Sequence, residues 1–300
     1  MKTPIPLLML ALAALPARAP AHALPITATT YIDSQAQNQT RNYGHAHTIK
    51  ALVNNNVTGD ASVCRGLFQL PPAIWACPPE QIRSARVVFY VWQDNSGSRD
   101  ITLYPMTRPF LPGTGTGTAP ADGATWLTAD GVNPWASPGG DYDSAHPVAG
   151  VKGGILDPDL HDRFFSWDIT ALLKDPATRA ALQNCGALLK IDETPPPATG
   201  TPRAPFTSAY DPGYPSSHWP TLQYTLAPVL DGVSIAGGAV SFTINGLIPG
   251  ATNIVERSLD LAADDWAPVA SFVAAGASTN WSEPLLPGGG QAFYRLRGPE

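Results

Sequence analysis

Charged residues are scarce in this 300-residue chain: Asp, Glu, Lys and Arg make up 14% of it, against about 25% in a typical soluble protein. Basic residues are also fewer than acidic ones, 18 against 24, for a net charge of −6. This balance argues against a nucleic-acid-binding surface, which needs clustered Lys and Arg. The low charge also argues against a disordered chain, and the composition lacks the helix formers that bundles and coiled coils need.

Long apolar runs are missing beyond the N-terminus. Residues 5–15 are apolar, follow Lys2, and are shorter than the roughly 20 residues needed to span a bilayer. Ala21-His22-Ala23 matches the small-residue pattern at which leaders are cleaved. We therefore predict that residues 1–23 are a secretory signal peptide and that the chain is secreted or displayed at the cell surface. A buried helix and a membrane anchor are the alternatives.

Without that leader the chain would keep 16 basic and 24 acidic residues, a net charge of −8. Nucleic acid and anionic membrane surfaces would repel such a chain, so we expect neither as a partner. No membrane span is expected after the leader.

Cysteine is rare, with three residues. Export would place them in an oxidising environment, and the chain between Cys64 and Cys77 passes through Pro71-Pro72, where it could fold back. We predict a Cys64–Cys77 disulfide and a free, buried Cys185; three unpaired buried thiols are the alternative. No C-x-x-C spacing occurs, which argues against a cysteine-based zinc site.

Glycine and proline are abundant instead, 27 and 32 residues, and they separate short strand-like segments. Residues 86–92 and 101–106 flank a turn cluster at 94–98 and are expected to form a hairpin. Asp168 is expected to cap a short helix over residues 169–174, and a second helical turn or two is expected at 177–184, after Asp175-Pro176. Residues 112–126 and 192–217 are expected to be long surface loops. The other expected strands cover residues 26–33, 48–53, 164–167, 186–191, 221–226, 240–247, 253–258, 269–274 and 292–296.

This pattern predicts an all-β protein of two domains. Residues 24–227 are expected to form a jelly-roll β-sandwich with one short helix, because strands dominate and the helices of a parallel α/β sheet are missing. Residues 228–300 hold five or six short strands, the size of an immunoglobulin- or fibronectin-like sandwich.

An ordered series of motifs in the first domain resembles the DNRLRE-type β-sandwich domains of secreted bacterial and archaeal proteins. These motifs occupy residues 30–34, 42–44, 65–71, 82–87, 101–105, 123–126, 166–170 and 219–224. The resemblance implies a jelly roll and, for some members, binding of polysaccharides, including acidic ones. The chain departs from the family in the inserted segment 64–77, the long loop 130–161 and the lack of an accompanying catalytic domain. Residues 255–258, Trp266 and 292–297 are similar to short C-terminal sandwich units of large secreted bacterial proteins, which imply no chemistry.

Polar clusters with possible chemistry all have a simpler interpretation. Asp157, Asp159 and Asp162 around His161, and Asp141 with Asp143, could form a calcium site or a carboxylate pair for catalysis. They stand among turn residues, where Asp is favoured for its bonds to the backbone. His45 and His47 could ligate a transition metal on one strand face, but such pairs are common on solvent faces. No serine or cysteine stands in a nucleophile motif.

Aromatic residues in the loops are the stronger signal. Trp135, Tyr142, Tyr210 and Tyr214 lie among Gly and Pro residues, and flat rings can stack on sugars. Trp135 and Tyr142 are expected to form the exposed pair. We therefore predict a non-catalytic protein that binds an extracellular polysaccharide or surface through these residues, without a cofactor, although calcium is possible. The alternatives are a structural surface or matrix protein without a small ligand and a polysaccharide lyase or hydrolase that uses Tyr142, His161 and nearby Asp residues.

Overall fold

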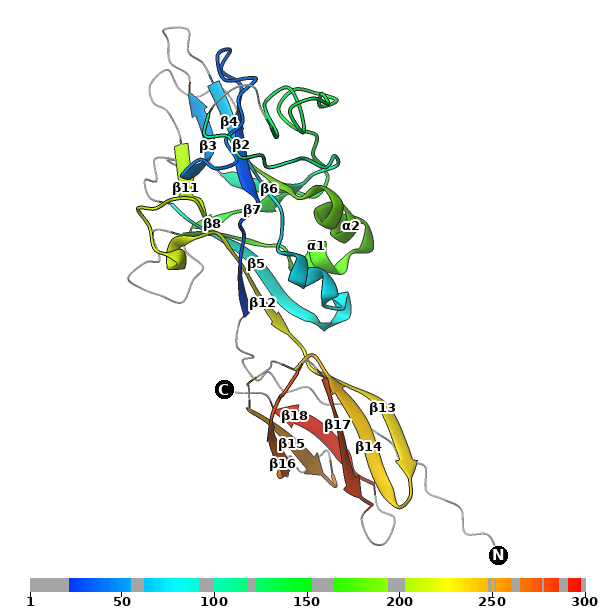
Figure 1. The fold of residues 1–300 in the computed structure, drawn as a ribbon. Coiled ribbons are helices and arrows are strands. Elements are labelled where there is room, and N and C mark those ends of the chain that lie inside the picture. Colours follow the sequence, from blue (N-terminus) through cyan, green and yellow to red (C-terminus); the bar gives the residue numbers. More distant parts are fainter. Residues whose placement is uncertain are drawn as a thin grey trace, which may run out of the picture. The chain divides into compact units, whose positions relative to one another are not determined.

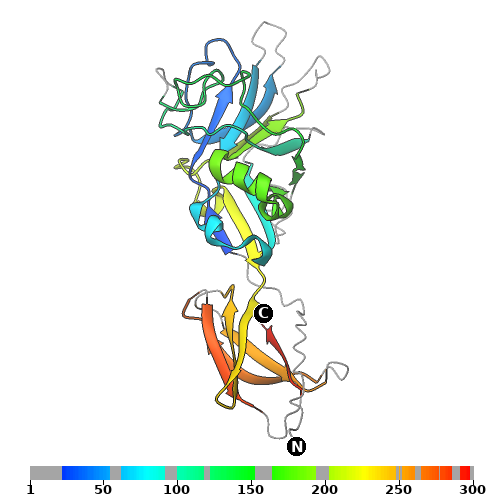
Figure 2. The same ribbon diagram turned by 90° about the vertical axis from the view of Figure 1, so that its right-hand side faces the viewer.

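The computed structural model describes residues 22–54, 62–91, 100–117, 122–152, 164–193, 203–247, 250, 252–260, 265–276, 278–285 and 291–297. The described chain divides into two compact units, His22–Tyr224 and the part that begins at Thr225. Figure 1 and Figure 2 show strands as the main element of both. No helix among these residues is long and apolar enough to cross a membrane.

The first unit is a sandwich of two mainly antiparallel sheets. One sheet has the order β1-β12-β5-β9-β8, and the other has the order β11-β3-β4-β10-β6-β7 with β2 paired to β4. The first and last strands of the unit, β1 and β12, are neighbours in the five-stranded sheet. The strands are β1 (His22–Pro25), β2 (Thr29–Asp33), β3 (Thr48–Asn54), β4 (Ser62–Phe68), β5 (Ile82–Tyr90), β6 (Ile101–Pro105), β7 (Val148–Ala149), β8 (Val151–Lys152), β9 (Phe164–Asp168), β10 (Ala187–Ile191), β11 (Arg203–Thr207) and β12 (Thr221–Leu226).

Aromatic rings fill the space between the two sheets. Phe89 of β5 contacts Phe68 of β4 and Trp167 of β9, with ring centroids 5.2 and 5.7 Å apart. Phe206 of β11 lies against the same group, and all four rings are fully buried. Burial of several large apolar side chains, each worth about 1.5–3 kcal/mol, makes this core the main source of stability.

Two helices follow β9, close to the helical segments predicted at residues 169–174 and 177–184. α1 covers Thr170–Lys174 and α2 covers Pro176–Cys185. Asp175 separates them because its side chain accepts from the backbone N–H of Ala177 and Thr178 and so caps α2. Three 3-10 turns complete the described helical elements, η1 (Pro72–Ala76), η2 (Pro79–Gln81) and η4 (Ser216–His218).

The second unit is a smaller sandwich of two three-stranded sheets, β13-β14-β17 and β16-β15-β18. Its core contains Phe242, Val255 and Tyr294, and buried Glu256 accepts from Arg295 at 2.6 Å. The strands are β13 (Val229–Ala236), β14 (Ala239–Asn245), β15 (Thr252–Ser258), β16 (Ala267–Val273), β17 (Ser278–Pro284) and β18 (Phe293–Arg297). The all-β sandwich class predicted from the sequence is confirmed.

Two local predictions are wrong. β5 and β6 do not form a hairpin, since β5 pairs with β9 in one sheet and β6 pairs with β10 in the other. The turn cluster at 94–98 lies outside the described residues. The expected loop 192–217 contains a strand, β11, which pairs with β3 and places fully buried Phe206 in the core.

The predicted Cys64–Cys77 disulfide is absent, and all three cysteines are free thiols. Cys64 packs with Tyr31 and Tyr43, whereas Cys77 ends η1 with its sulfur 3.9 Å from the carbonyl oxygen of Ala73. The chain does not fold back at the prolines, because β4 runs on from Cys64 to Phe68 and the 3-10 turn continues beyond it. Cys185 is free and buried, as predicted.

Candidate functional site

The seven-stranded sheet buries residues on both of its faces. Phe68 and Leu189 point into the sandwich, so their neighbours Leu67 and Leu188 point to the opposite face. The loop that follows β6 covers that face with a second apolar cluster. This outer cluster consists of Ile32, Leu67, Met106, Phe110, Ala124, Ala129, Trp135, Cys185 and Leu188, with Tyr104, Trp126 and Tyr142 packed against it.

Trp135 belongs to the outer cluster and is 4% exposed. Its indole N–H donates to the carbonyl oxygen of Thr125 at 2.9 Å. The expectation of an exposed Trp135 is therefore wrong: the Gly- and Pro-rich loop folds onto the sheet and uses this ring as its own core. Trp135 cannot stack on a sugar in this conformation.

Arg65 of β4 lies at the edge of the outer cluster and holds the loop in place. Its guanidinium donates to both carboxylate oxygens of Glu193 at 2.7 and 2.8 Å and to the carbonyl oxygen of Gly139 at 2.7 Å. It also lies over the ring of Trp126, 5.0 Å from the centroid. A bidentate pair of this kind is stronger and more directional than a single ionic contact.

Tyr142 is half-buried between charged and aromatic neighbours. Its hydroxyl accepts from Lys190 at 3.1 Å, and the Arg65 guanidinium lies 5.6 Å from its ring centroid. The ring of Tyr104 is 4.9 Å away. Burial lowers the pKa of Lys190, whereas its hydrogen bond to Tyr142 and the charge of Glu193 raise it. The upward effects together are larger, so the pKa of Lys190 lies above its ordinary value. Side chains of the protein itself thus pack around the Tyr142 ring.

A pocket of about 600 Å³ opens beside Tyr142. Arg108 borders it with a side chain 39% exposed and 4.0 Å from Asp141. Asp141 is held by the backbone N–H groups of Ala136 and Ser137, at 2.9 and 3.1 Å. The pocket therefore presents a guanidinium, a fixed carboxylate and hydroxyl groups. Its lining residues are Thr107, Arg108, Ala136, Ser137, Gly140, Asp141 and Tyr142.

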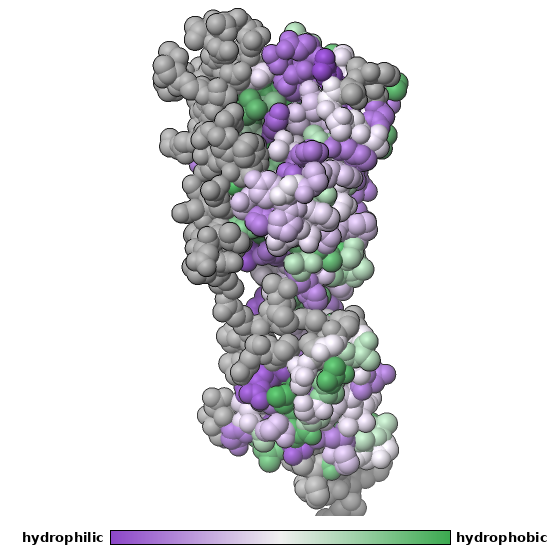
Figure 3. Space-filling model, turned by 60° about the vertical axis from the view of Figure 1, so that its left-hand side comes forward, coloured by the Kyte–Doolittle hydropathy of each residue, from purple (hydrophilic) through white to green (hydrophobic). Residues whose placement is uncertain are grey.

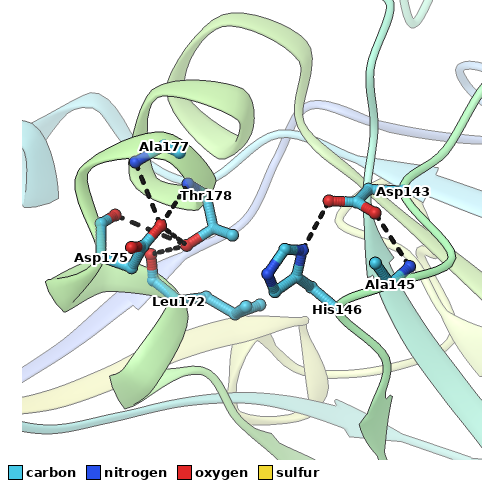
Figure 4. A network of polar contacts seen from close by, with 7 residues as sticks. All are labelled: Asp143, Ala145, His146, Leu172, Asp175, Ala177 and Thr178. Carbon is cyan, nitrogen blue, oxygen red and sulfur yellow. Dashed lines mark hydrogen bonds and ion pairs between the residues drawn. The ribbon is translucent and has the colours of Figure 1, made fainter.

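A polar network continues from this loop toward the helices (Figure 4). Asp143 accepts from the backbone N–H of Ala145 and lies 2.6 Å from Nδ1 of His146. The His146 contact and the backbone bond lower the pKa of Asp143. Figure 4 shows His146 between Asp143 and the α2 cap around Asp175. Asp141 and Asp143 thus both accept bonds from their own loop, as the turn interpretation expects.

Tyr210 and Tyr214 lie apart from the pocket-lining residues and have partners of their own. Tyr210 is 39% exposed and stacks on His45 with ring centroids 4.1 Å apart. Tyr214 packs beside Tyr90 and His218, at 5.5 and 5.7 Å. The four aromatic residues predicted as one binding set therefore occur in three separate environments.

Metal sites receive no support among the described residues, which contain no group of three or more His, Cys, Asp or Glu side chains placed to hold an ion. Asp157, Asp159, His161 and Asp162 lie outside the described residues. The calcium prediction for them stays a prediction.

Sequence reasoning missed Arg65, Arg108, Lys190 and Glu193. Arg65 and Glu193 are 128 positions apart, so no local spacing connects them. A usable signal was the apolar character of adjacent residues in β4 and β10, which indicates strands covered on both faces.

Comparison with known proteins adds no assignment: no family model matches the chain, and no curated protein matches it.

Proposed function

We propose that this chain is an exported protein that binds an extracellular polysaccharide without altering it chemically. The observation that carries the proposal is the pocket bordered by Arg108, Asp141 and Tyr142. Sugars need donors and acceptors at fixed positions next to a less polar surface, and this pocket supplies both kinds of contact.

Arg108 is the central binding residue in this proposal. Its contact to Asp141 is long, at 4.0 Å, and its side chain is partly exposed, so it keeps donors for a ligand. The planar guanidinium suits two neighbouring sugar hydroxyls or one sugar carboxylate. Asp141, already fixed by two backbone N–H groups, can accept from a further hydroxyl.

Two further features support recognition of a hydrated ligand. Hydrophilic and neutral residues cover much of the described N-terminal unit on the face drawn in Figure 3. The pocket is framed by residues that the outer cluster and the Arg65–Glu193 pair hold in place, which limits the ordering cost of binding.

A structural role at a cell surface or in a matrix is the second candidate. It is favoured by the burial of Trp135 and by the contacts that occupy Tyr142, because two of the predicted stacking residues then serve the fold. Under this alternative the pocket has no saccharide ligand.

Retention on a panel of immobilised polysaccharides, with and without a chelator, tests the proposal. We expect retention by at least one polysaccharide and its loss in Arg108→Ala. Lys174→Ala is the matched control, because it removes an exposed cation at the end of α1. Equal retention of both variants, or none by the unaltered protein, would reject the site. Release of reducing ends or unsaturated products would reject the non-catalytic part.

A further inference from the structure

The charges that line the pocket beside Tyr142 are balanced. Among the described residues of its wall, Arg108 is the one cation and Asp141 the one carboxylate. Thr107 and Ser137 add neutral hydroxyl groups. The wall therefore has no surplus of positive charge to offer an anionic ligand.

The Arg108 guanidinium and the Asp141 carboxylate lie side by side without a hydrogen bond. Nη1 and Oδ2 are 4.0 Å apart, beyond the range of about 2.7–3.2 Å for an N–H···O bond. The backbone N–H groups of Ala136 and Ser137 donate to the two carboxylate oxygens, one to each. Each oxygen keeps a further lone pair. A donor and an acceptor thus stand at neighbouring fixed positions, and both are free to bind a ligand.

A second carboxylate also interacts with Arg108. Hydrogen bonds from Asn133 and Val132 lower the pKa of Asp130, and the charge of Arg108 adds to this effect. The positive charge of Arg108 is therefore offset by two carboxylates, those of Asp141 and Asp130.

Two further cations contact Tyr142, but their donors are used within the protein. Arg65 donates to both carboxylate oxygens of Glu193 and to the carbonyl oxygen of Gly139. Lys190 lies 3.3 Å from Glu193 and donates to the Tyr142 hydroxyl. The whole chain carries a net charge of −6, which repels a polyanion at longer range.

We propose that the pocket binds a neutral polysaccharide through two adjacent free hydroxyls of one sugar ring and discriminates against sugars that carry a carboxylate. This inference rests on the proposed binding of a polysaccharide at this pocket. One hydroxyl accepts from Arg108 and its neighbour donates to Asp141, because a hydroxyl group can do either. A sugar carboxylate on Arg108 would instead lie beside the Asp141 carboxylate, and the repulsion between like charges would weaken binding.

Matched ligands separate the effect of charge from that of shape. Short oligosaccharides of polygalacturonate, polymannuronate and polyglucuronate are compared with the same oligosaccharides after reduction of each carboxyl group to an alcohol. The reduced forms keep the backbone and its adjacent hydroxyls but lose the charge. Calorimetry on the full chain should show binding about tenfold tighter or more for the reduced form of a pair that binds, with little dependence on salt.

Periodate treatment tests the adjacent hydroxyls themselves. Periodate breaks the carbon–carbon bond between two neighbouring hydroxyls, and borohydride then converts the aldehydes formed into alcohols. The treated ligand stays neutral and keeps its glycosidic linkages. We expect it to lose binding.

Substitutions locate the discrimination in the pocket. Arg108→Ala should remove binding of the reduced form, and Lys174→Ala should leave it unchanged. Asp141→Asn should narrow the difference between the two forms of a pair, because the amide is neutral but keeps an oxygen for a backbone N–H. Thermal unfolding reports whether this variant keeps its fold. The ligand comparison on the unaltered protein does not depend on it.

The outcomes distinguish this inference from the proposed function. Equal or tighter binding of a carboxylated form, lost in Arg108→Ala, would overturn the inference and leave polysaccharide binding intact. Binding that survives periodate treatment would overturn the role of adjacent hydroxyls. The same criteria apply to any polysaccharide retained from the wider panel, which we expect to be neutral and to carry adjacent free hydroxyls. Absence of binding to every pair and to the wider panel would reject the proposed function as well.

Discussion

Arg65 and Glu193, 128 positions apart, form a bidentate ion pair with bonds of 2.7 and 2.8 Å at the edge of the outer cluster. Their side chains are 12% and 18% exposed, so water screens the pair only in part. The same guanidinium bonds to Gly139 and lies over Trp126. This single side chain therefore connects a strand, the covering loop and the end of β10.

Arg65→Ala should lower the free energy of unfolding by about 1–3 kcal/mol, because it removes two charged hydrogen bonds to a largely buried carboxylate that keeps only its contact to Lys190, at 3.3 Å. Arg65→Lys keeps the charge but cannot form both bonds to Glu193. Its free energy of unfolding should therefore lie between that of the unaltered protein and that of Arg65→Ala. Denaturant unfolding measures the difference. A change below about 0.5 kcal/mol in Arg65→Ala would show that the pair is as weak as an exposed one.

Trp135→Ala should destabilise the N-terminal unit by about 3–5 kcal/mol, the usual cost of deleting a buried indole. Trp135→Phe keeps most of the apolar volume but loses the bond to Thr125, so its cost should be smaller. Thermal unfolding separates the variants. Full stability of Trp135→Ala together with lost polysaccharide retention would instead restore Trp135 as a surface residue.

Acid should destabilise the covering loop and the helix cap. Hydrogen bonds to Thr114 lower the pKa of Asp122, and bonds to Thr178 and Ala177 lower that of Asp175. A carboxyl group whose pKa is lower in the folded state stabilises the fold above its unfolded pKa of about 3.9, and this contribution is lost as the pH falls through the folded value.

The melting temperature should therefore change little between about pH 7 and 5 from these groups and should fall below about pH 4. Asp122→Asn removes one of the titrating groups and should make that fall shallower. An unchanged acid profile in Asp122→Asn would contradict the assigned contribution of this carboxyl group.

Denatured protein should react at three thiols per chain, because all three cysteines are free. In the native state Cys77 should react first, since Cys64 and Cys185 are buried. Burial raises the pKa of the Cys77 thiol, which keeps even this reaction slow at neutral pH.

Arg179→Ala should speed the labelling of Cys77, because we expect the greater exposure of the thiol to outweigh the loss of the Arg179 charge, which lowers the Cys77 pKa. The Arg179 guanidinium donates to the carbonyl oxygen of Cys77 at 2.8 Å and to that of Trp75 at 3.2 Å, so its loss frees the η1 segment. Lys174→Ala should leave the labelling rate unchanged. One reactive thiol per denatured chain would mean that a disulfide does form.

Much of the fold was accessible from the sequence, because β-branched and aromatic runs such as β5 and β9 are bounded by turn residues. Which strands pair with one another was harder to predict from the sequence. The hairpin prediction for β5 and β6 rested on the turn cluster at 94–98 between them. A turn cluster does not reveal whether the two strands it joins pair with each other or lie in opposite sheets, as β5 and β6 do.

The candidate site was only partly accessible. Tyr142 was identified because its ring stands in a Gly- and Pro-rich loop, and it does line the pocket. Trp135 carried the same local signal but is buried, because exposure depends on which sheet face the loop covers. Arg108 belongs to no recognisable sequence motif. Its position beside Asp141 depends on the tertiary fold, which the local sequence does not reveal.

Calorimetry with a soluble fragment of the retained polysaccharide tests the binding proposal most directly. The dissociation constant is compared between the unaltered protein, Arg108→Ala and Lys174→Ala. The account predicts saturable binding that weakens about tenfold or more in Arg108→Ala, the loss expected for a hydrogen-bonded charged contact, and is unchanged in Lys174→Ala. Equal affinity in all three proteins, with the fold of each intact, would contradict binding at the pocket.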